Sequence, residues 1–287
     1  MANLINRFRS TLVRTRLARG RKRAARLASV AALGLIAILS APRVAAAYSI
    51  NFPPTDFTIY SPDGTQTLGS SHYYIEQVPG GEIAILHGED RYLDGGYDIE
   101  SERLQLDHNG GFPALLEFDH TFFAADGSPT MRGHADLRSG LASCDKYGAG
   151  TIPSPPQQVT FPPDTYAGAS LLIPLQSFLG AGNIDKLHLH AFSCTPGPRV
   201  FAITASVDAN PVPKALFSDS LIKVDAHPDF GWITFLVQPF VPKLDAWFDP
   251  NGQWRFMGAE LARFYGGTPI MMVTTQSQSD RAAAAQK

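Results

Sequence analysis

The chain has none of the common catalytic signatures. It contains no GxSxG elbow, no HExxH, no phosphate loop, no GxGxxG and no CxxC pair. Each of these marks a frequent class of hydrolase, metalloprotease, nucleotide-binding protein or thiol oxidoreductase. Their absence argues against the common hydrolase and oxidoreductase classes.

Acidic residues are missing from the first 47 positions, which hold ten of the 24 basic residues. The apolar stretch 27–41 follows the basic region, and Ala47 and Tyr48 then mark a small-residue cleavage site. We expect residues 1–47 to be a cleaved bacterial signal peptide, because a membrane span needs about 20 apolar residues. An uncleaved anchor and an organelle transit peptide are the alternatives. The segment lacks an Arg-Arg pair and a following cysteine, which disfavours twin-arginine export and excludes a lipid-modified N-terminus.

Without this segment the chain is strongly acidic. It keeps 14 basic residues against 26 acidic ones, a formal charge near −12. Phosphate binding relies on clustered Lys and Arg, so we expect no nucleic-acid partner and no attraction to anionic lipid. No later apolar stretch reaches spanning length, so we expect no stable membrane span after cleavage and a periplasmic or secreted protein. In an oxidising compartment Cys144 and Cys194 favour a disulfide, with two buried thiols as the alternative.

Turn signals separate short strand-like runs through most of the remaining chain. This pattern predicts a mainly β fold, a curved antiparallel sheet or half-barrel, with one short helix near the middle, around 165–179. Pro174 predicts a break or kink in that helix. We expect one domain over 48–273, with a Pro-rich stretch at 150–164 as a surface crossing or sub-boundary, and a disordered tail over 274–287.

One hairpin can be assigned a register. If Asp94 and Gly95 form a two-residue turn, Leu93 faces Gly96 and Glu89 faces Glu100. A like-charge pair of this kind is unfavourable unless a neighbour compensates for it. Compensation by nearby basic side chains is one interpretation, and a divalent cation or a shared proton is the other. The face is a candidate polar cluster of His87, Glu89, Arg91, Asp98, Glu100 and Glu102.

A second candidate lies in the run LHLH, where strand alternation places His188 and His190 on one face. Two histidines at this spacing can ligate zinc, but a third ligand is needed, such as His120 or His134. An ordinary polar strand face is the other interpretation.

The run LDAWFDPNGQWRFMGAEL, over 244–261, resembles the closing hairpin of bacterial periplasmic proteins of uncharacterised role that are built as a curved antiparallel sheet or half-barrel. Lipoprotein carriers use a related half-barrel to shelter acyl chains, so the resemblance implies an apolar cavity. Many large aromatic residues late in the chain are compatible with such a cavity. We therefore expect an exported envelope protein that binds a lipid or other apolar molecule. We expect it to have no cofactor. A metal-dependent hydrolase using a His/carboxylate cluster and a structural surface protein without ligand are the alternatives.

Overall fold

The computed structural model describes residue 50 and residues 52–106, 111–148, 154–182, 185–194, 197–208, 216–217, 220–229, 244–263 and 267–275. All of them belong to one compact unit, Ala46–Lys287. The predicted signal peptide, its cleavage site at Ala47 and Tyr48, and residues 276–287 lie outside the described residues. In the described part of the chain, no helix has the length and apolar character needed to cross a membrane.

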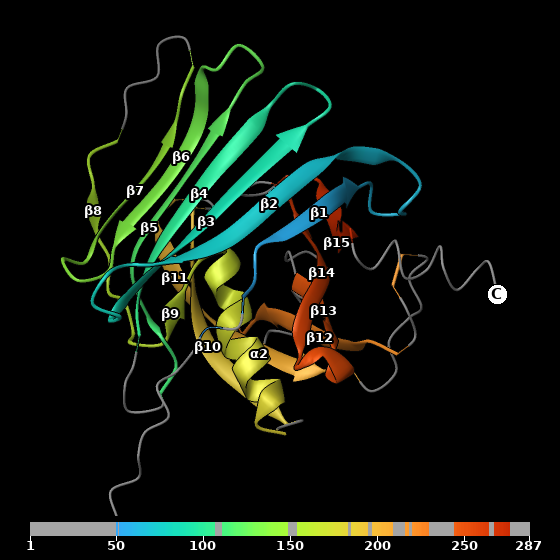
Figure 1. Cartoon of the computed structure of the whole chain (residues 1–287). Coiled ribbons are helices and arrows are strands. Elements are labelled where there is room, and N and C mark those ends of the chain that lie inside the picture. The colour runs from blue at the N-terminus through green and yellow to red at the C-terminus, as the bar shows by residue number, and fades with distance from the viewer. Residues whose placement is uncertain are drawn as a thin grey trace, which may run out of the picture. The chain divides into compact units, whose positions relative to one another are not determined.

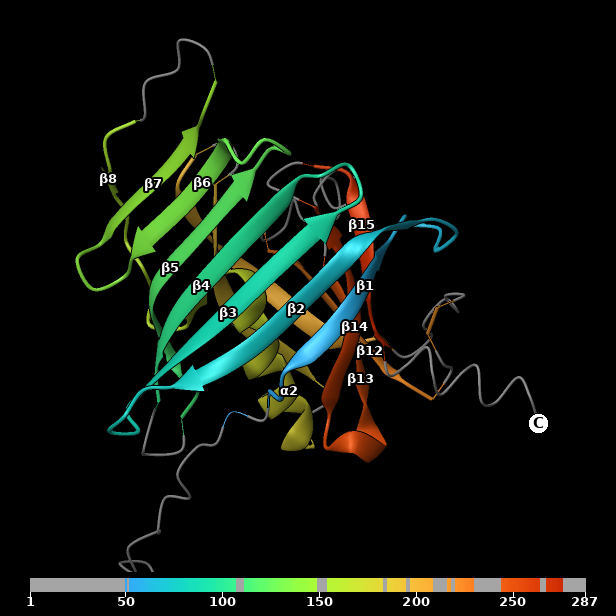
Figure 2. The ribbon, with the colours of Figure 1, turned by 45° about the horizontal axis from the view of Figure 1, so that its top comes forward.

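The mainly β prediction is confirmed, because within the described residues fifteen strands form a single sheet. The sheet runs in the order β8-β7-β6-β5-β4-β3-β2-β1-β15-β14-β13-β12-β11-β10-β9 (Figures 1 and 2). Neighbouring strands are antiparallel except β9 and β10, which pair in parallel over two residues. The strands are β1 (Thr55–Tyr60), β2 (Thr67–Gln77), β3 (Ile83–Tyr92), β4 (Tyr97–Gln105), β5 (Ala114–Phe123), β6 (Pro129–Asp136), β7 (Leu141–Lys146), β8 (Gln157–Gln158), β9 (Thr165–Tyr166), β10 (Lys186–Ser193), β11 (Arg199–Val207), β12 (Ile222–Pro228), β13 (Leu244–Asp249), β14 (Arg255–Ala262) and β15 (Pro269–Thr274).

The sheet is curved but not closed, and its two edges lie near one another. Strand β8 forms one edge and β9 the other, yet they are joined by residues 159–164 alone. A chain of that length spans at most about 25 Å, so the edges must lie within this distance. The Pro-rich stretch over 150–164 therefore includes a crossing between the edges of one sheet.

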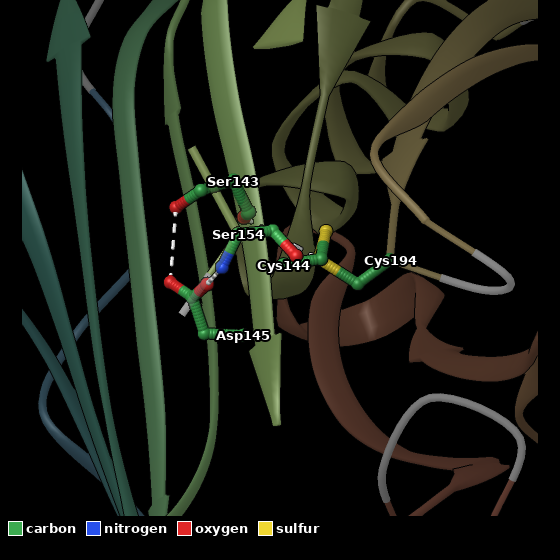
Figure 3. The surroundings of a disulfide bond; sticks show 5 residues. All are labelled: Ser143, Cys144, Asp145, Ser154 and Cys194. Atoms are coloured by element: carbon green, nitrogen blue, oxygen red, sulfur yellow. Dashed lines mark hydrogen bonds between the residues drawn. A yellow bond between two sulfur atoms is a disulfide. The ribbon is translucent and has the colours of Figure 1, made fainter. Parts of the chain in front are cut away.

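A disulfide bond also joins the two ends of the sheet, as predicted. Cys144 lies in β7 and Cys194 directly after β10, each next to an edge strand, and their Cα atoms are 5.5 Å apart (Figure 3). Beside it, Asp145 accepts hydrogen bonds from the Ser143 hydroxyl at 3.3 Å and from the Ser154 backbone N–H at 3.0 Å. These contacts hold the chain leaving β7 close to that strand.

The predicted mid-chain helix is present as a short 3₁₀ turn, η1 (Gly168–Leu171), followed by α2 (Leu172–Gly180). The expected break at Pro174 is absent. Proline is tolerated there because Pro174 is the third residue of α2, where a backbone N–H has no partner within an α-helix. The helix lies on the concave side of the sheet (Figures 1 and 2). It joins the main core through Leu172, Ile173, Leu175, Phe178 and Leu179.

The predicted hairpin between β3 and β4 exists, but its register was wrong by one residue. Arg91 pairs with Tyr97 and Gly88, not Glu89, lies opposite Glu100. The Tyr92 backbone N–H donates to the carbonyl of Gly96, so the turn contains three residues, 93–95, instead of two. A shift of one residue turns the β3 side chains to the other face relative to β4.

The predicted hairpin at 244–261 is confirmed as β13, the 3₁₀ turn η4 (Pro250–Gly252) and β14. It does not close the sheet, because β15 follows it and pairs with β1. Strand β15 ends at Thr274, which is buried, so Thr274 belongs to the sheet, whereas the prediction placed it in the tail.

Candidate functional site: an acidic wall in an apolar cavity

Strand β4 has the reverse of the usual polarity for a half-buried strand. Its inward positions carry Asp98, Glu100 and Glu102, which are at most 3% exposed, whereas Ile99 on the opposite face is 47% exposed. Most such strands place apolar residues inward and polar residues outward. Burying carboxyl groups is costly unless partners satisfy them. Burial of these three acids on the concave face therefore costs free energy unless specific partners bind their carboxyl groups.

The structure divides the predicted polar cluster between the two faces of the sheet. Side chains alternate between the two faces along a strand, so Asp98, Glu100 and Glu102 all face inward on β4. On β3, His87, Glu89 and Arg91 all face outward. On the outer face Arg91 forms an ion pair with Glu89, and His87 lies 3.4 Å from Glu76. These six residues therefore do not form one site.

His120, on the neighbouring strand β5, lies between two of the inward acids. Its Nε2 is 2.8 Å from Asp98 Oδ1, and its Nδ1 is 3.9 Å from Glu100 Oε2. Burial alone would lower the pKa of this imidazole. The carboxyl groups of Glu100 and Asp98 outweigh burial and raise the pKa of His120 to about 9. His120 therefore carries a positive charge at neutral pH and partly balances the acids.

Asp90 joins this cluster from β3, where it lies opposite Asp98. Its Oδ2 is 3.5 Å from the Tyr92 hydroxyl, while its buried Oδ1 has no hydrogen-bond partner. Burial and then the negative charge of Asp98 raise the pKa of Asp90 to about 8, and burial raises the pKa of Asp98 as well. Asp90 is missing from the predicted polar cluster, because a two-residue turn would place its side chain on the solvent face of the sheet.

The backbone before α2 holds the other two acids. The Ala169 N–H donates to Glu100 Oε1 at 2.9 Å, and the Ser170 N–H donates to Glu102 Oε1 at 2.8 Å. A Cβ on Gly168, whose φ is +44°, would lie 1.7 Å from Glu100 Oε1, so only glycine permits this approach. Burial, followed by the neighbouring Glu100, raises the pKa of Glu102 well above its ordinary value.

A second glycine brings a tyrosine to the same acids. The ring of Tyr73, on β2, covers Gly88 so closely that a Cβ there would lie 2.3 Å from the ring. From this position the Tyr73 hydroxyl lies 3.4 Å from Glu100 Oε2. Burial, with the negative charge of Asp90, raises the pKa of Tyr73 well above its usual range, so it remains a hydrogen-bond donor.

Asp90, Asp98, Glu100 and Glu102, here called the acidic wall, lie beside a cavity of about 450 Å³ on the concave side of the sheet, and Asp90 and Glu100 line it. Asp90, Glu100, His120 and Tyr73 reach the cavity from the β2–β5 side, and Gly168 and Ala169 reach it from η1. The remaining lining is mostly apolar. It includes Phe52, Phe57, Phe122, Leu171, Leu172, Ala191, Phe201, Ile203, Ala226, Pro228, Leu244, Phe256, Ala259, Leu261, Ala262, Ile270 and Met272, with Ser193, Arg199 and Arg263 as further polar members.

This fold is similar to a solved β-barrel-like protein of the domain of unknown function DUF1849 from Brucella abortus. The match has a TM-score of 0.44 and 13% sequence identity, and it covers 78% of this chain and 96% of that one. No family model and no curated protein matches the chain. The likeness agrees with the expected resemblance to uncharacterised bacterial proteins, and it carries no argument about a ligand or an activity.

Within the described residues, no third ligand joins the predicted histidine pair, His188 and His190. His188 Nδ1 lies 3.2 Å from the Thr204 hydroxyl, whereas His190 Nδ1 lies 2.8 Å from Asp164 Oδ1. The suggested third ligands are engaged elsewhere, His120 with Asp98 and His134 with Asp119. Among the residues that the structure describes, no three His, Cys, Asp or Glu side chains are grouped to hold a metal ion.

Proposed function

We propose that the chain is an exported, non-enzymatic protein that binds an apolar small molecule in the cavity of its curved sheet. The observation that carries the proposal is the cavity itself, which is lined mostly by aromatic and aliphatic side chains. Its volume of about 450 Å³ is within the usual range for small-molecule sites, which are mostly apolar with a few placed polar groups. The disulfide supports an oxidising compartment outside the cytoplasm.

The test is titration of the purified chain with an apolar fluorophore, 1-N-phenylnaphthylamine. We expect saturable binding near one equivalent and a micromolar dissociation constant. Replacing Ala226 on the cavity wall with Phe fills part of the space, and we expect it to weaken binding at least about tenfold, because overpacking a close-fitting site is unfavourable.

The matched control is Ile99→Phe, which adds an aromatic ring on the outer face of β4. It should leave the affinity unchanged. Absence of saturable binding, or equal effects of the two substitutions, would reject the cavity as a ligand site and favour a structural surface protein. Circular dichroism of both variants establishes that they are folded.

A further inference from the structure

We infer that the ligand of this cavity carries a cationic amine on its apolar body, and that the amine donates hydrogen bonds to Asp90. The inference rests on the proposed function and names the chemical class of its ligand. It requires a side chain that lines the cavity, has a buried acceptor oxygen without a hydrogen-bond partner, and lies among other acidic side chains. Asp90 meets each of these requirements.

Asp90 Oδ1, Asp98 Oδ2 and Glu102 Oε2 are buried without a hydrogen-bond partner, and of these three acids Asp90 is the one that lines the cavity. It lines the cavity, is 6% exposed, and has no hydrogen-bond partner at Oδ1. Glu100 is in a different position, because it accepts from the Ala169 N–H and the Tyr73 hydroxyl and lies near His120. A buried carboxyl oxygen without a partner costs free energy that an N–H donor on a ligand would recover. Asp90 is therefore the acceptor left for a ligand.

The surroundings favour a positive donor over a neutral one. Asp98, Glu100 and Glu102 lie on the adjacent strand, and His120 is the basic side chain placed among them. An ammonium group bound here would favour the ionised forms of these acids and interact favourably with them, whereas a carboxylate would gain no such interaction. The acidic balance of the chain after residue 47 also favours approach of a cation.

The two arginines at the cavity do not offer a matching buried site for an anion. Arg263 is already engaged, because it donates to both carboxyl oxygens of Asp94, at 2.9 and 3.2 Å, and stacks 3.7 Å from the centre of the Tyr92 ring. Arg199 is solvent-exposed at the start of β11. An anionic head group would therefore gain only a screened contact at the rim.

The test compares three ligands with the same chain length and different head groups. Dodecylammonium, dodecanol and dodecanoate displace 1-N-phenylnaphthylamine below their micelle concentrations. We expect dodecylammonium to bind at least about tenfold more tightly than dodecanol, the size expected for one hydrogen bond to a charged group, and dodecanoate to bind most weakly.

Two variants on adjacent residues locate the effect. Asp90→Asn keeps the shape of the side chain but removes its ability to ionise, and we expect the amine preference to fall to about twofold while dodecanol binds as before. Glu89→Gln removes an ionisable carboxyl group from the outer face of the same strand and should keep the full preference. A general loss of negative charge would lower the preference in Glu89→Gln as well.

The outcomes separate the two proposals. Equal binding of amine and alcohol, tightest binding of dodecanoate, or an undiminished preference in Asp90→Asn overturns the amine inference while apolar binding stands. Failure of the fluorophore and of all three ligands to bind overturns the proposed function and the inference together.

Proton release provides an independent measurement. The pKa of Asp90 is raised to about 8, so an ammonium that binds near pH 7 must displace a proton from it. Between pH 6 and pH 8 we expect dodecylammonium to bind more tightly as pH rises, and Asp90→Asn to remove this dependence. An affinity independent of pH in the original chain contradicts the inference. The titratable and polar groups facing Asp90 are Ser71 and Tyr73 on β2, Tyr92 on β3, Asp98 and Glu100 on β4, and His120 on β5.

Discussion

Asp90 and His120 link the stability of the protein to pH. Both have a folded pKa above the ordinary value, about 8 against 3.8 for Asp90 and about 9 against 6.5 for His120. The folded state therefore binds more protons than the unfolded state, and the free energy of unfolding falls as pH rises. The stabilising contribution of each group is full below its ordinary pKa and is lost as pH passes through its folded pKa. We expect the Tm to fall between pH 6 and pH 9, as measured by circular dichroism.

The variant Asp90→Asn isolates one part of this dependence. Asparagine does not titrate, so its Tm should fall less steeply between pH 6 and pH 8, where Asp90 loses its proton in the original chain. Above pH 8 the loss of charge on His120 should still lower the Tm of both chains. A Tm that rises over this range in the original chain would contradict the assignment of raised pKa values to the buried cluster.

Gly168 is a position where one methyl group should disrupt the acidic wall. A Cβ there would lie 1.7 Å from Glu100 Oε1, so Gly168→Ala must move η1 or the carboxyl group. We expect a loss of about 2 kcal/mol or more in the free energy of unfolding, measured in urea. Gly182→Ala is the matched control, because Gly182 also has a positive φ, of +74°, but nothing lies within 4 Å of a Cβ there. It should cost about 1 kcal/mol, the strain of the left-handed backbone alone.

At the scale of elements, the positions of several strands can be predicted from the sequence, but the register between β3 and β4 cannot. Turn signals located β3, β4 and the hairpin of β13 and β14, and the helical segment near residue 165 was also found. The register of β3 against β4 depends on one residue in the turn, and Leu93 shows why the choice was difficult. It follows a strand and has an apolar side chain, yet it is 75% exposed and belongs to the turn. Because strand side chains alternate, this error placed Asp90 on the wrong face.

Arg263 connects the turn after β3 to the end of β14, across several intervening strands. Its ion pair with Asp94 and its stacking on Tyr92 are each worth a few tenths of a kcal/mol to about 1 kcal/mol in partly exposed positions. We expect Arg263→Ala to lower the free energy of unfolding by about 1 kcal/mol. It should also increase amide hydrogen exchange at residues 93–97, because the turn loses its contact with β14.

Arg91→Ala is the control for this contact. Arg91 forms an ion pair with Glu89 on the exposed outer face of the same strand, where such pairs contribute little. Its substitution should change stability by less than about 0.5 kcal/mol and leave exchange at the turn unchanged. Equal effects of the two arginine substitutions would mean that the contact between the turn and β14 contributes nothing of its own.

At the scale of the whole compact unit, the residues that line the cavity could not have been predicted from local patterns. Its lining comes from β1–β5 on one side and β10–β15 on the other, together with η1 and the first residue of α2. Alternation within a strand shows which residues share a face, but not how sharply a sheet bends or which distant strands then face each other. The aromatic residues are compatible with a bent sheet. The acidic wall depends on the pairing of β3 with β4, which places Asp90 on the same face as Asp98.

The disulfide links the two ends of this open sheet covalently. Cys144 and Cys194 belong to strands or strand ends next to the two edges, so the bond restrains the separation of the walls around the cavity. The sequence separation of 50 residues gives a stabilisation of about 4 kcal/mol in the chain-entropy model. We expect a Cys144→Ala/Cys194→Ala variant to lose up to this amount in urea unfolding.

The same bond should control how fast a ligand leaves. With residues 159–164 still joining β8 to β9, the reduced chain keeps its edges near each other but lacks the fixed distance between β7 and the end of β10. Opening of the walls then requires less free energy, so 1-N-phenylnaphthylamine should dissociate several-fold faster in stopped-flow measurements after reduction. Reductant should have no effect on the double alanine variant. Unchanged dissociation in the reduced chain would mean that the ligand leaves without separation of the sheet edges, past the rim where Arg263 meets Asp94.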